Sequence, residues 1–276
     1  MNTQISFKKS FAEKKVLKII SGINNFDVKK VFNIVNTAEF SSATYIDVSA
    51  NINLIKLIKK VSKLPICVSV IDSSNIYKCL ANGAEIIEIG NYDLFYKHGH
   101  IFSSKRIINL VKEIKILFPQ ITLCVTLPHD LSVKKQLILA KQLMQLGVNL
   151  FQTEGLSSHV SYSNNIYSIG KSLSKVSATL STTYILSDKS SIPIVTASGL
   201  TQTTIPMAFA YGASGIGISQ SLLKMKNLNE MNALTNTVKK IISNTSCHNI
   251  DYSHQQICLS PGFKSLIINK ILSHSK

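Results

Sequence analysis

Short runs of apolar, β-branched residues alternate along the whole chain with longer segments of helical periodicity. The runs predict eight strands, at residues 17–21, 44–49, 66–70, 85–89, 122–126, 148–152, 193–197 and 215–218. The segments between them carry apolar residues at spacings of three, four and seven, as in 107–117. This spacing places the apolar residues on one face of a helix. The pattern therefore predicts a strand-helix repeat from end to end.

Strict alternation is typical of α/β proteins with parallel sheets. Eight repeats in a chain of 276 residues favour a single-domain (β/α)8 TIM barrel. A doubly wound open sheet is the alternative, but it usually has a Gly-rich fingerprint after the first strand, where this chain has SGINNF with one glycine. We therefore predict a barrel over residues 1–245 that begins with a short helix, followed by a C-terminal extension over 246–276.

Apolar and mixed positions alternate within the predicted strands. In strand 44–49, Ile46 and Val48 alternate with Tyr45, Asp47 and Ser49. We expect the apolar face to contact the helices and the mixed face to line the barrel interior. Polar side chains near the carboxyl ends of the strands would then border an active site, because this fold places its sites at that end.

Three ionisable residues, Lys18, Asp47 and Glu88, fall on predicted interior positions. A buried lysine is costly unless it is paired, and two nearby carboxylates would keep it charged. If burial instead lowered its pKa, Lys18 could act as a base or as the amine of a Schiff base. A shielded Glu88 could serve as a general acid or base. A purely structural ion network is the alternative for all three.

Two further candidates follow predicted strands. Glu154, in the segment FQTEG, is a candidate general acid or base, or a carboxylate that caps the next element. His129, in LPHD, would lie at the same end of the barrel, where it is either an acid–base residue or merely exposed.

The segment 192–224 predicts a phosphate site. Ser198 and Gly199 would follow the seventh strand, and Gly217 and Ser219 would lie at the end of the eighth and open a helical turn. Glycine lets backbone N–H groups approach an oxygen closely, and a helix N-terminus adds partial positive charge. The ligand could be a sugar phosphate, another phosphoester or the phosphate of flavin mononucleotide (FMN). The alternative is that these glycines only make tight turns.

Composition excludes several classes of protein. Hydrophobic residues make up 45% of the chain and charged residues 16%, which indicates a packed core. The net charge is +16, but the lysines are scattered along predicted helices, so we expect no nucleic-acid partner. No apolar run reaches the ~18 residues that a membrane-spanning helix needs, so we expect no membrane partner.

The five cysteines form no CxxC pair, and three lie in or beside apolar segments. Buried thiols in a reducing compartment fit this pattern. Near the end of the chain, Cys247, His248, His254 and Cys258 have a spacing that could hold zinc, but no second cysteine pair supports such a site. We therefore predict no metal site.

Six segments, taken together and in order, are similar to one known family. They are LKIISGINNFD (17–27), ATYIDVSA (43–50), LPICVSV (64–70), GAEIIEIGNYD (83–93), FQTEG (151–155) and VTASGLTQTTIPMAFAYGASGIGI (195–218). Over about residues 6–245 the chain resembles the hypothetical chloroplast reading frame twenty-three family. The resemblance implies an aldolase-type barrel and an uncharacterised protein of the chloroplast stroma, and it implies no catalytic residues. The C-terminal tail departs from the family pattern.

These expectations favour an enzyme that acts on a small phosphorylated metabolite by lyase or isomerase chemistry. Lys18, Asp47 and Glu88 would form its polar interior, with Glu88 as the preferred acid–base residue. Phosphate anchoring would orient the reacting carbons. Two alternatives stay open: an FMN-dependent oxidoreductase, and a barrel that binds a metabolite without turnover as a regulator. The oligomeric state is left open as well.

Overall fold

The computed structural model of the chain describes residues 9–90, 92–96, 102–155 and 168–246. Eight parallel strands pair in the order of the sequence, and β1 pairs with β8 to close the barrel. The strands are β1 Val16–Ile20, β2 Tyr45–Ser49, β3 Ile66–Val70, β4 Ile86–Ile89, β5 Thr122–Leu127, β6 Leu150–Thr153, β7 Ile194–Ala197 and β8 Gly215–Ile218. The predicted (β/α)8 barrel is confirmed, and the open-sheet alternative is wrong.

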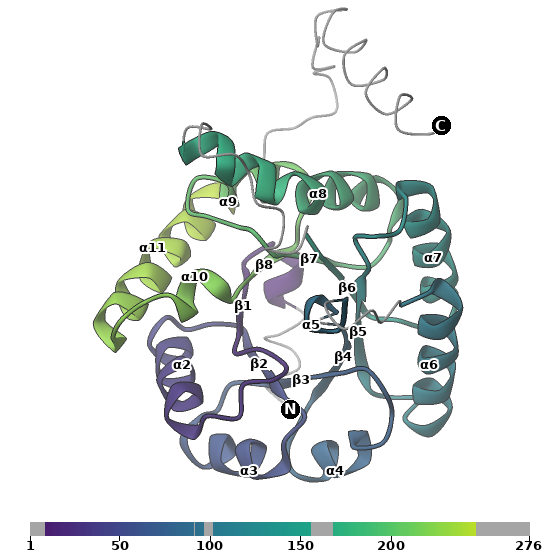
Figure 1. Cartoon of the computed structure of the whole chain (residues 1–276), viewed down its shortest axis with the longest axis horizontal. Helices are drawn as coiled ribbons and strands as arrows, with labels where there is room; N and C mark the ends of the chain where they lie inside the picture. The colour runs from purple at the N-terminus through teal and green to yellow at the C-terminus, as the bar shows by residue number, and fades with distance from the viewer. Residues whose placement is uncertain (1–8, 91, 97–101, 156–167, 247–276) are drawn as a thin grey trace, which may run out of the picture. The chain divides into compact units, whose positions relative to one another are not determined.

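Helices form a ring around the barrel (Figure 1). The helices of this ring are α2 Val28–Phe40, α3 Ile52–Val61, α4 Ile76–Ala81, α6 Ser104–Leu117, α7 Val133–Gln145, α8 Ser168–Lys189, α9 Ile205–Ala210 and α11 Leu228–Ser246. Two four-residue helices, α5 (Asp93–Tyr96) and α10 (Gln220–Leu223), follow β4 and β8. A helical turn at residues 9–12 precedes β1, where the sequence predicts a short helix.

Local sequence determines where helices begin and end. The side chains of Asp27 and Asn51 accept hydrogen bonds from backbone N–H groups three residues later, at 3.1 Å each, and so satisfy donors that the first turn of a helix leaves unpaired. Gly83, Gly147 and Gly212 follow helices with φ values of 106°, 77° and 95°. A left-handed backbone at these predicted helix ends favours glycine, because a Cβ is strained there.

The barrel has an outer and an inner apolar core. Outward-facing residues of the strands, such as Ile46 and Ile87, pack with the helices in one large cluster. Inside the barrel a smaller cluster occupies the amino-terminal halves of the strands and includes Phe11 from the helical turn. Its members are Phe11, Val16, Tyr45, Cys67, Ile86, Cys124, Leu150 and Val195. The predicted alternation of outward and inward positions is therefore confirmed in β2 and β4.

The chain divides into a unit at Met1–Ser246 and a second unit at Cys247–Lys276. The second unit, with the candidate zinc residues Cys247, His248, His254 and Cys258, lies outside the described residues. Cys67, Cys79 and Cys124 are buried free thiols, as the pattern of cysteines predicts. Within the described ranges no helix has the length and apolar character needed to cross a membrane.

Phe11 provides a test of the inner apolar core. Its side chain is buried, with 7% exposure, whereas Phe26 is 58% exposed. We expect Phe11→Ala to lower the free energy of unfolding by about 3 kcal/mol, because it removes a buried ring and leaves a cavity. The matched control Phe26→Ala should change it by less than about 0.5 kcal/mol. Urea unfolding followed by circular dichroism measures both values, and equal losses would contradict the role given to Phe11.

Candidate functional site

Lys18 lies at the centre of a buried polar cluster inside the barrel. Its ammonium nitrogen forms ion pairs with Asp47 of β2, at 2.8 Å, and with Glu88 of β4. The same nitrogen donates a hydrogen bond to the side-chain oxygen of Gln152 in β6, at 2.8 Å. These three partners match the three N–H donors of an ammonium group. The structure therefore brings together the three ionisable residues that the sequence places in the interior.

Neighbouring hydroxyl and amide groups hold the two carboxylates. Ser69 donates from its hydroxyl to the Asp47 carboxylate, at 2.9 and 3.1 Å from the two oxygens. Glu88 Oε1 accepts from Thr126 Oγ1 at 3.0 Å and from Gln152 Nε2 at 2.6 Å. Every carboxylate in this cluster is therefore both ion-paired and hydrogen-bonded, as buried charges require.

Gly90 leaves room for this arrangement just after β4. A Cβ at Gly90 would lie 2.4 Å from Thr126 Oγ1 and 2.7 Å from Glu88 Oε1. Any side chain here would displace the Glu88 carboxylate or the Thr126 hydroxyl. The backbone of the β4 loop therefore lies directly against the polar cluster.

Burial and ion pairing shift the pKa values within the cluster. Burial alone would lower the pKa of Lys18, but the charges of Asp47 and Glu88 outweigh it, and the pKa is well above its usual value. Burial raises the pKa of Asp47 to about 6, an effect that Glu88 increases and Lys18 opposes. Lys18 is therefore an ammonium ion, which is the first of the two alternatives that the sequence leaves open.

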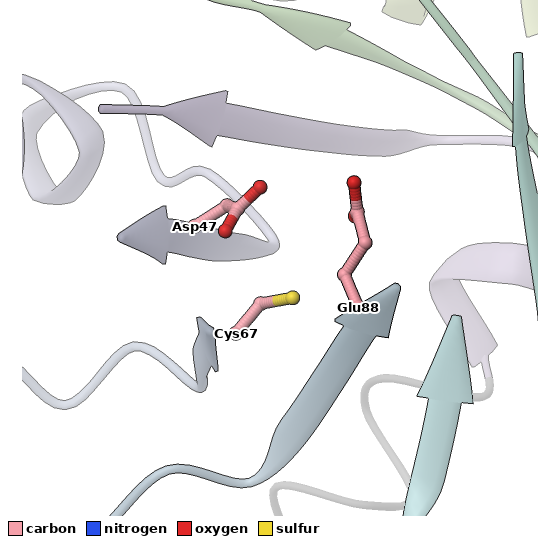
Figure 2. Close-up of side chains that lie close together, drawn as sticks. All are labelled: Asp47, Cys67 and Glu88. Atoms are coloured by element: carbon pink, nitrogen blue, oxygen red, sulfur yellow. The ribbon is translucent and has the colours of Figure 1, made fainter. Parts of the chain in front are cut away.

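Asp47, Cys67 and Glu88 point toward one another from β2, β3 and β4 (Figure 2). Their donor atoms lie within 4.8 Å of one another, a spacing that a metal ion could bridge. However, the ammonium of Lys18 contacts both carboxylates, and burial keeps the pKa of the Cys67 thiol well above its usual value. A metal would need the thiolate, so this donor set fits the lysine, and the absence of a metal stays a prediction.

Glu154, His129 and Tyr96 form a second cluster at the carboxyl ends of β5 and β6. Glu154 Oε2 lies 3.0 Å from His129 Nδ1 and 3.3 Å from the backbone nitrogen of His129, and it accepts a hydrogen bond from the Tyr96 hydroxyl at 3.1 Å. The Tyr96 and His129 rings pack edge to face with their centroids 5.2 Å apart. The side chains of His129 and Glu154 are 13% and 6% exposed. Two candidates that the sequence treats separately are thus in direct contact.

Strand pairing and a buried tyrosine position this second cluster. β5 and β6 are neighbours, with Leu127 beside Thr153, so the residues that follow the two strands emerge side by side. The Tyr92 hydroxyl donates to the backbone oxygens of Ile89 and Thr126 at 3.3 and 3.2 Å, which holds α5 and Tyr96 over these strand ends. The sequence pattern does not predict Tyr96 or Gln152 as site residues, although Gln152 lies in β6 two residues before Glu154.

The four predicted phosphate residues lie at the ends of two adjacent strands. β7 pairs with β8, and Ala197 lies beside Gly217. Ser198 and Gly199 both have a left-handed backbone, with φ values of 76° and 72°, and Ser219 directly precedes α10. A Cβ at Gly217 would lie 3.8 Å from Cδ of Lys18. The ends of β7 and β8 are therefore neighbours, and Gly217 of β8 lies beside Lys18 of β1.

An open groove of about 490 Å³ lies elsewhere, between the loop after β3 and α6. Its lining residues are Ile71, Asp72, Ser73, Ser103, Lys105, Arg106, Asn109, Leu110 and Glu113. The groove contains none of the predicted site residues, and acidic and basic side chains lie together in it. We therefore place the candidate site at the two polar clusters, inside the barrel and at the ends of β5 and β6.

The closed parallel barrel has the aldolase-type TIM-barrel fold. Solved structures of similar fold include thiamine phosphate pyrophosphorylase from Pyrococcus furiosus, with 14% identity, a TM-score of 0.55 and coverage of 84% of this chain and 98% of that one. Another is (S)-3-O-geranylgeranylglyceryl phosphate synthase from Thermoplasma acidophilum in complex with its substrate sn-glycerol-1-phosphate, with 13% identity, a TM-score of 0.57 and coverage of 86% and 98%. At these identities the likeness shows the fold alone.

Residues 1–248 match the family model described as "Protein of unknown function (DUF561)", and the chain belongs to this family. Among its relatives is "Uncharacterized protein ycf23" of Porphyra purpurea, which is 39% identical over 250 residues, or 91% of this chain and 92% of the relative. The protein of the same name from Cyanidium caldarium is 38% identical over 234 residues, or 85% and 93% of the two chains. The family resemblance seen in the sequence is thus confirmed.

The buried ion pairs predict a large effect of removing Lys18. In Lys18→Met two buried carboxylates lose their cation, so we expect the free energy of unfolding at neutral pH to fall by about 3–5 kcal/mol. Lys59→Met is the matched control, because the Lys59–Glu85 ion pair is about one third exposed and should contribute about 0–1 kcal/mol. Urea unfolding measures both variants, and a loss in Lys18→Met no greater than in Lys59→Met would count against the buried network.

The raised pKa of Asp47 predicts a pH dependence of stability. The folded protein holds the Asp47 proton up to about pH 6, whereas the unfolded chain loses it near the ordinary value of 3.8. Between about pH 4 and 6 the folded state therefore binds more protons, and this group lowers the free energy of unfolding by about 3 kcal/mol as the pH rises. Asp47→Asn has no such proton, so its stability should not show this fall. Urea unfolding of both proteins at about pH 4, 5, 6 and 7 tests this, and parallel curves would refute it.

Proposed function

We propose that this protein is an enzyme that binds a small phosphorylated metabolite and converts it by lyase or isomerase chemistry. The observation that carries the proposal is that β8, which ends at the predicted phosphate residues, pairs with β1 beside Lys18 of the polar interior. Gly217 lies beside Ala197 at the end of β7, and its Cβ position is 3.8 Å from the Lys18 side chain. A phosphate bound at these turns would place the rest of the molecule over the ionisable groups.

The turns supply the kind of groups that bind phosphate. Two successive positive φ values, at Ser198 and Gly199, turn the chain sharply after β7. The missing side chain of Gly199 leaves its backbone N–H open to close approach by an oxygen. Thr179 of α8 donates its hydroxyl to the Ser198 carbonyl oxygen at 3.1 Å, which fixes the turn from behind. The Ser219 hydroxyl and the N–H groups that follow it would complete the anchor from β8.

The charge state of Lys18 limits the chemistry. A Schiff base needs a neutral amine, and the carboxylates of Asp47 and Glu88 keep the pKa of Lys18 well above its usual value. Lys18 would instead stabilise negative charge that develops on a substrate oxygen, and the Asp47 carboxylate would keep Lys18 protonated. The carboxylates of Glu88 and Glu154 remain the proposed acid–base groups. Proton transfer beside a carbonyl, without a covalent intermediate, fits this set best.

We assign the protein to the plastid stroma. The family name refers to chloroplast reading frames, and the buried free thiols Cys67, Cys79 and Cys124 suit a reducing compartment. An FMN-dependent oxidoreductase and a non-catalytic metabolite-binding barrel are the alternatives. Both would use the same phosphate anchor, so ligand identity and turnover distinguish them.

The anchor is tested by thermal shifts with inorganic phosphate, sugar phosphates and FMN, and native mass spectrometry identifies what is bound. At one hundred times Kd a ligand stabilises the folded state by about 2.7 kcal/mol, which raises the Tm of a barrel of this size by about 5–10 °C. We expect Gly199→Ala to abolish this rise, because its methyl group lies beside the anchoring N–H.

Gly147→Ala is the matched control for Gly199→Ala. Its φ of 77° resembles the 72° of Gly199, so both variants carry similar backbone strain, but Gly147 precedes β6 at the opposite end of the barrel. It should therefore keep the ligand-induced rise in Tm. A Tm that no member of the panel raises in the wild type would contradict the anchor, and binding without turnover would favour the regulatory barrel.

A further inference from the structure

The contact between His129 and Glu154 sets the chemistry of the histidine ring. Nδ1 lies 3.0 Å from the Glu154 carboxylate. An ionised carboxylate accepts hydrogen bonds and cannot donate them. The proton of the neutral ring therefore belongs on Nδ1, and Nε2 carries the lone pair. The backbone N–H of His129 points to the same carboxylate oxygen at 3.3 Å. Ring and backbone are thus oriented by a single group.

Tyr96 contacts the same oxygen of this carboxylate. Its hydroxyl donates to Glu154 Oε2 at 3.1 Å, and burial, Glu154 and Asp130 all raise the pKa of Tyr96, so the phenol stays protonated. Glu154 Oε2 therefore contacts both His129 and Tyr96, which suits this carboxylate to orienting the histidine. Among the described residues, Glu154 just after β6 and Tyr96 of α5 contact His129, and Asp130 is its neighbour in the loop.

The second cluster adjoins the proposed phosphate anchor through Gly155. A Cβ at Gly155 would lie 2.6 Å from Thr179 Oγ1 and 3.0 Å from Ser198 Oγ. Glu154 is the preceding residue, so the segment that carries it packs directly against the turn after β7. A molecule anchored at that turn would extend between the two clusters.

We propose that His129 removes and returns the substrate's proton, that Glu154 positions His129, and that the substrate is a phosphate ester with a carbonyl group beside the reacting C–H bond. This inference rests on the proposed function, and it changes the role of Glu154 from acid–base residue to positioning residue. Nε2 takes the proton from carbon, the electron pair of that C–H bond moves toward the carbonyl oxygen to give an enolate, and the ring becomes an imidazolium. Where the reacting carbon carries a hydroxyl group, the same proton returns to the former carbonyl carbon and the hydroxyl proton moves to the former carbonyl oxygen, which completes an isomerisation without an oxidant or co-reactant.

The first test is nuclear magnetic resonance of the full-length chain with nitrogen-15-labelled histidine. We expect His129 to be the Nδ1–H tautomer. Glu154→Gln should lower its pKa by about one unit, because the carboxylate favours the imidazolium. Tyr96→Phe should raise it, because the carboxylate loses a competing donor, and Glu85→Gln, which removes an exposed carboxylate before β4, should leave it unchanged. An Nε2–H tautomer, or a His129 pKa that does not change in Glu154→Gln, overturns the inference.

The second test follows hydrogen–deuterium exchange at carbon in dihydroxyacetone phosphate and ribose 5-phosphate, for each of these that raises the Tm of the wild type. His129→Gln should slow exchange by about 100-fold or more while the Tm rise is retained. Glu154→Gln should slow it less, with little change in KM and with the pH profile displaced toward lower pH. Bound ligand without exchange, or exchange that survives His129→Gln, overturns the inference. If neither compound raises the Tm but another member of the phosphate panel does, the proposed substrate class is overturned and the anchor stands; if no member raises it, the anchor fails. In both cases the tautomer measurement decides the arrangement of His129 and Glu154.

Discussion

One ammonium group, that of Lys18, makes the charged interior of this barrel possible. Two carboxylates buried without a cation would cost several kcal/mol each, and the three donors of Lys18 bind acceptors from β2, β4 and β6. The lysine on β1 therefore links strands on different sides of the barrel. The same contacts account for the high pKa of Lys18 and the directions in which the side chains of Glu88 and Gln152 point. Side chains nearer the carboxyl end rest on this layer.

Two polar layers lie one above the other: the lower layer is the Lys18 cluster, and the upper layer is the cluster of His129, Glu154 and Tyr96 at the strand ends. Glu154 follows Gln152 by two residues just beyond the end of β6, and Gly90 follows Glu88 by two residues just beyond the end of β4. The lower layer holds fixed charge, whereas the upper layer holds His129 and its partners at the partly exposed strand ends. Gly217 of β8 lies beside the lower layer, and Gly155 lies against the turn after β7 in the upper one. Anion binding and proton transfer would thus share one rigid support.

Periodic features were predictable from the sequence, and contacts between separate segments were not. The strands, the glycines that end helices and the inward parity of Asp47 and Glu88 follow from spacings of two and 3.6 residues. Tyr96 was missed because the segment around α5 shows no period, and its importance depends on its contact with Glu154. Gln152 was missed because the candidates were ionisable residues at interior positions, and a glutamine side chain is neutral. The His129–Glu154 pair follows from the pairing of β5 with β6, which only the closed barrel reveals.

The apolar layer around Phe11 limits how water and small molecules reach the barrel interior. Apolar side chains, including Val16, Tyr45, Ile86 and Leu150, fill the amino-terminal half of the interior and close that end of the barrel. Water, protons and any metabolite would reach Asp47 and Glu88 only from the opposite rim. Substrate and product would then use the same opening at the carboxyl end, so a product would have to dissociate before the next substrate could bind.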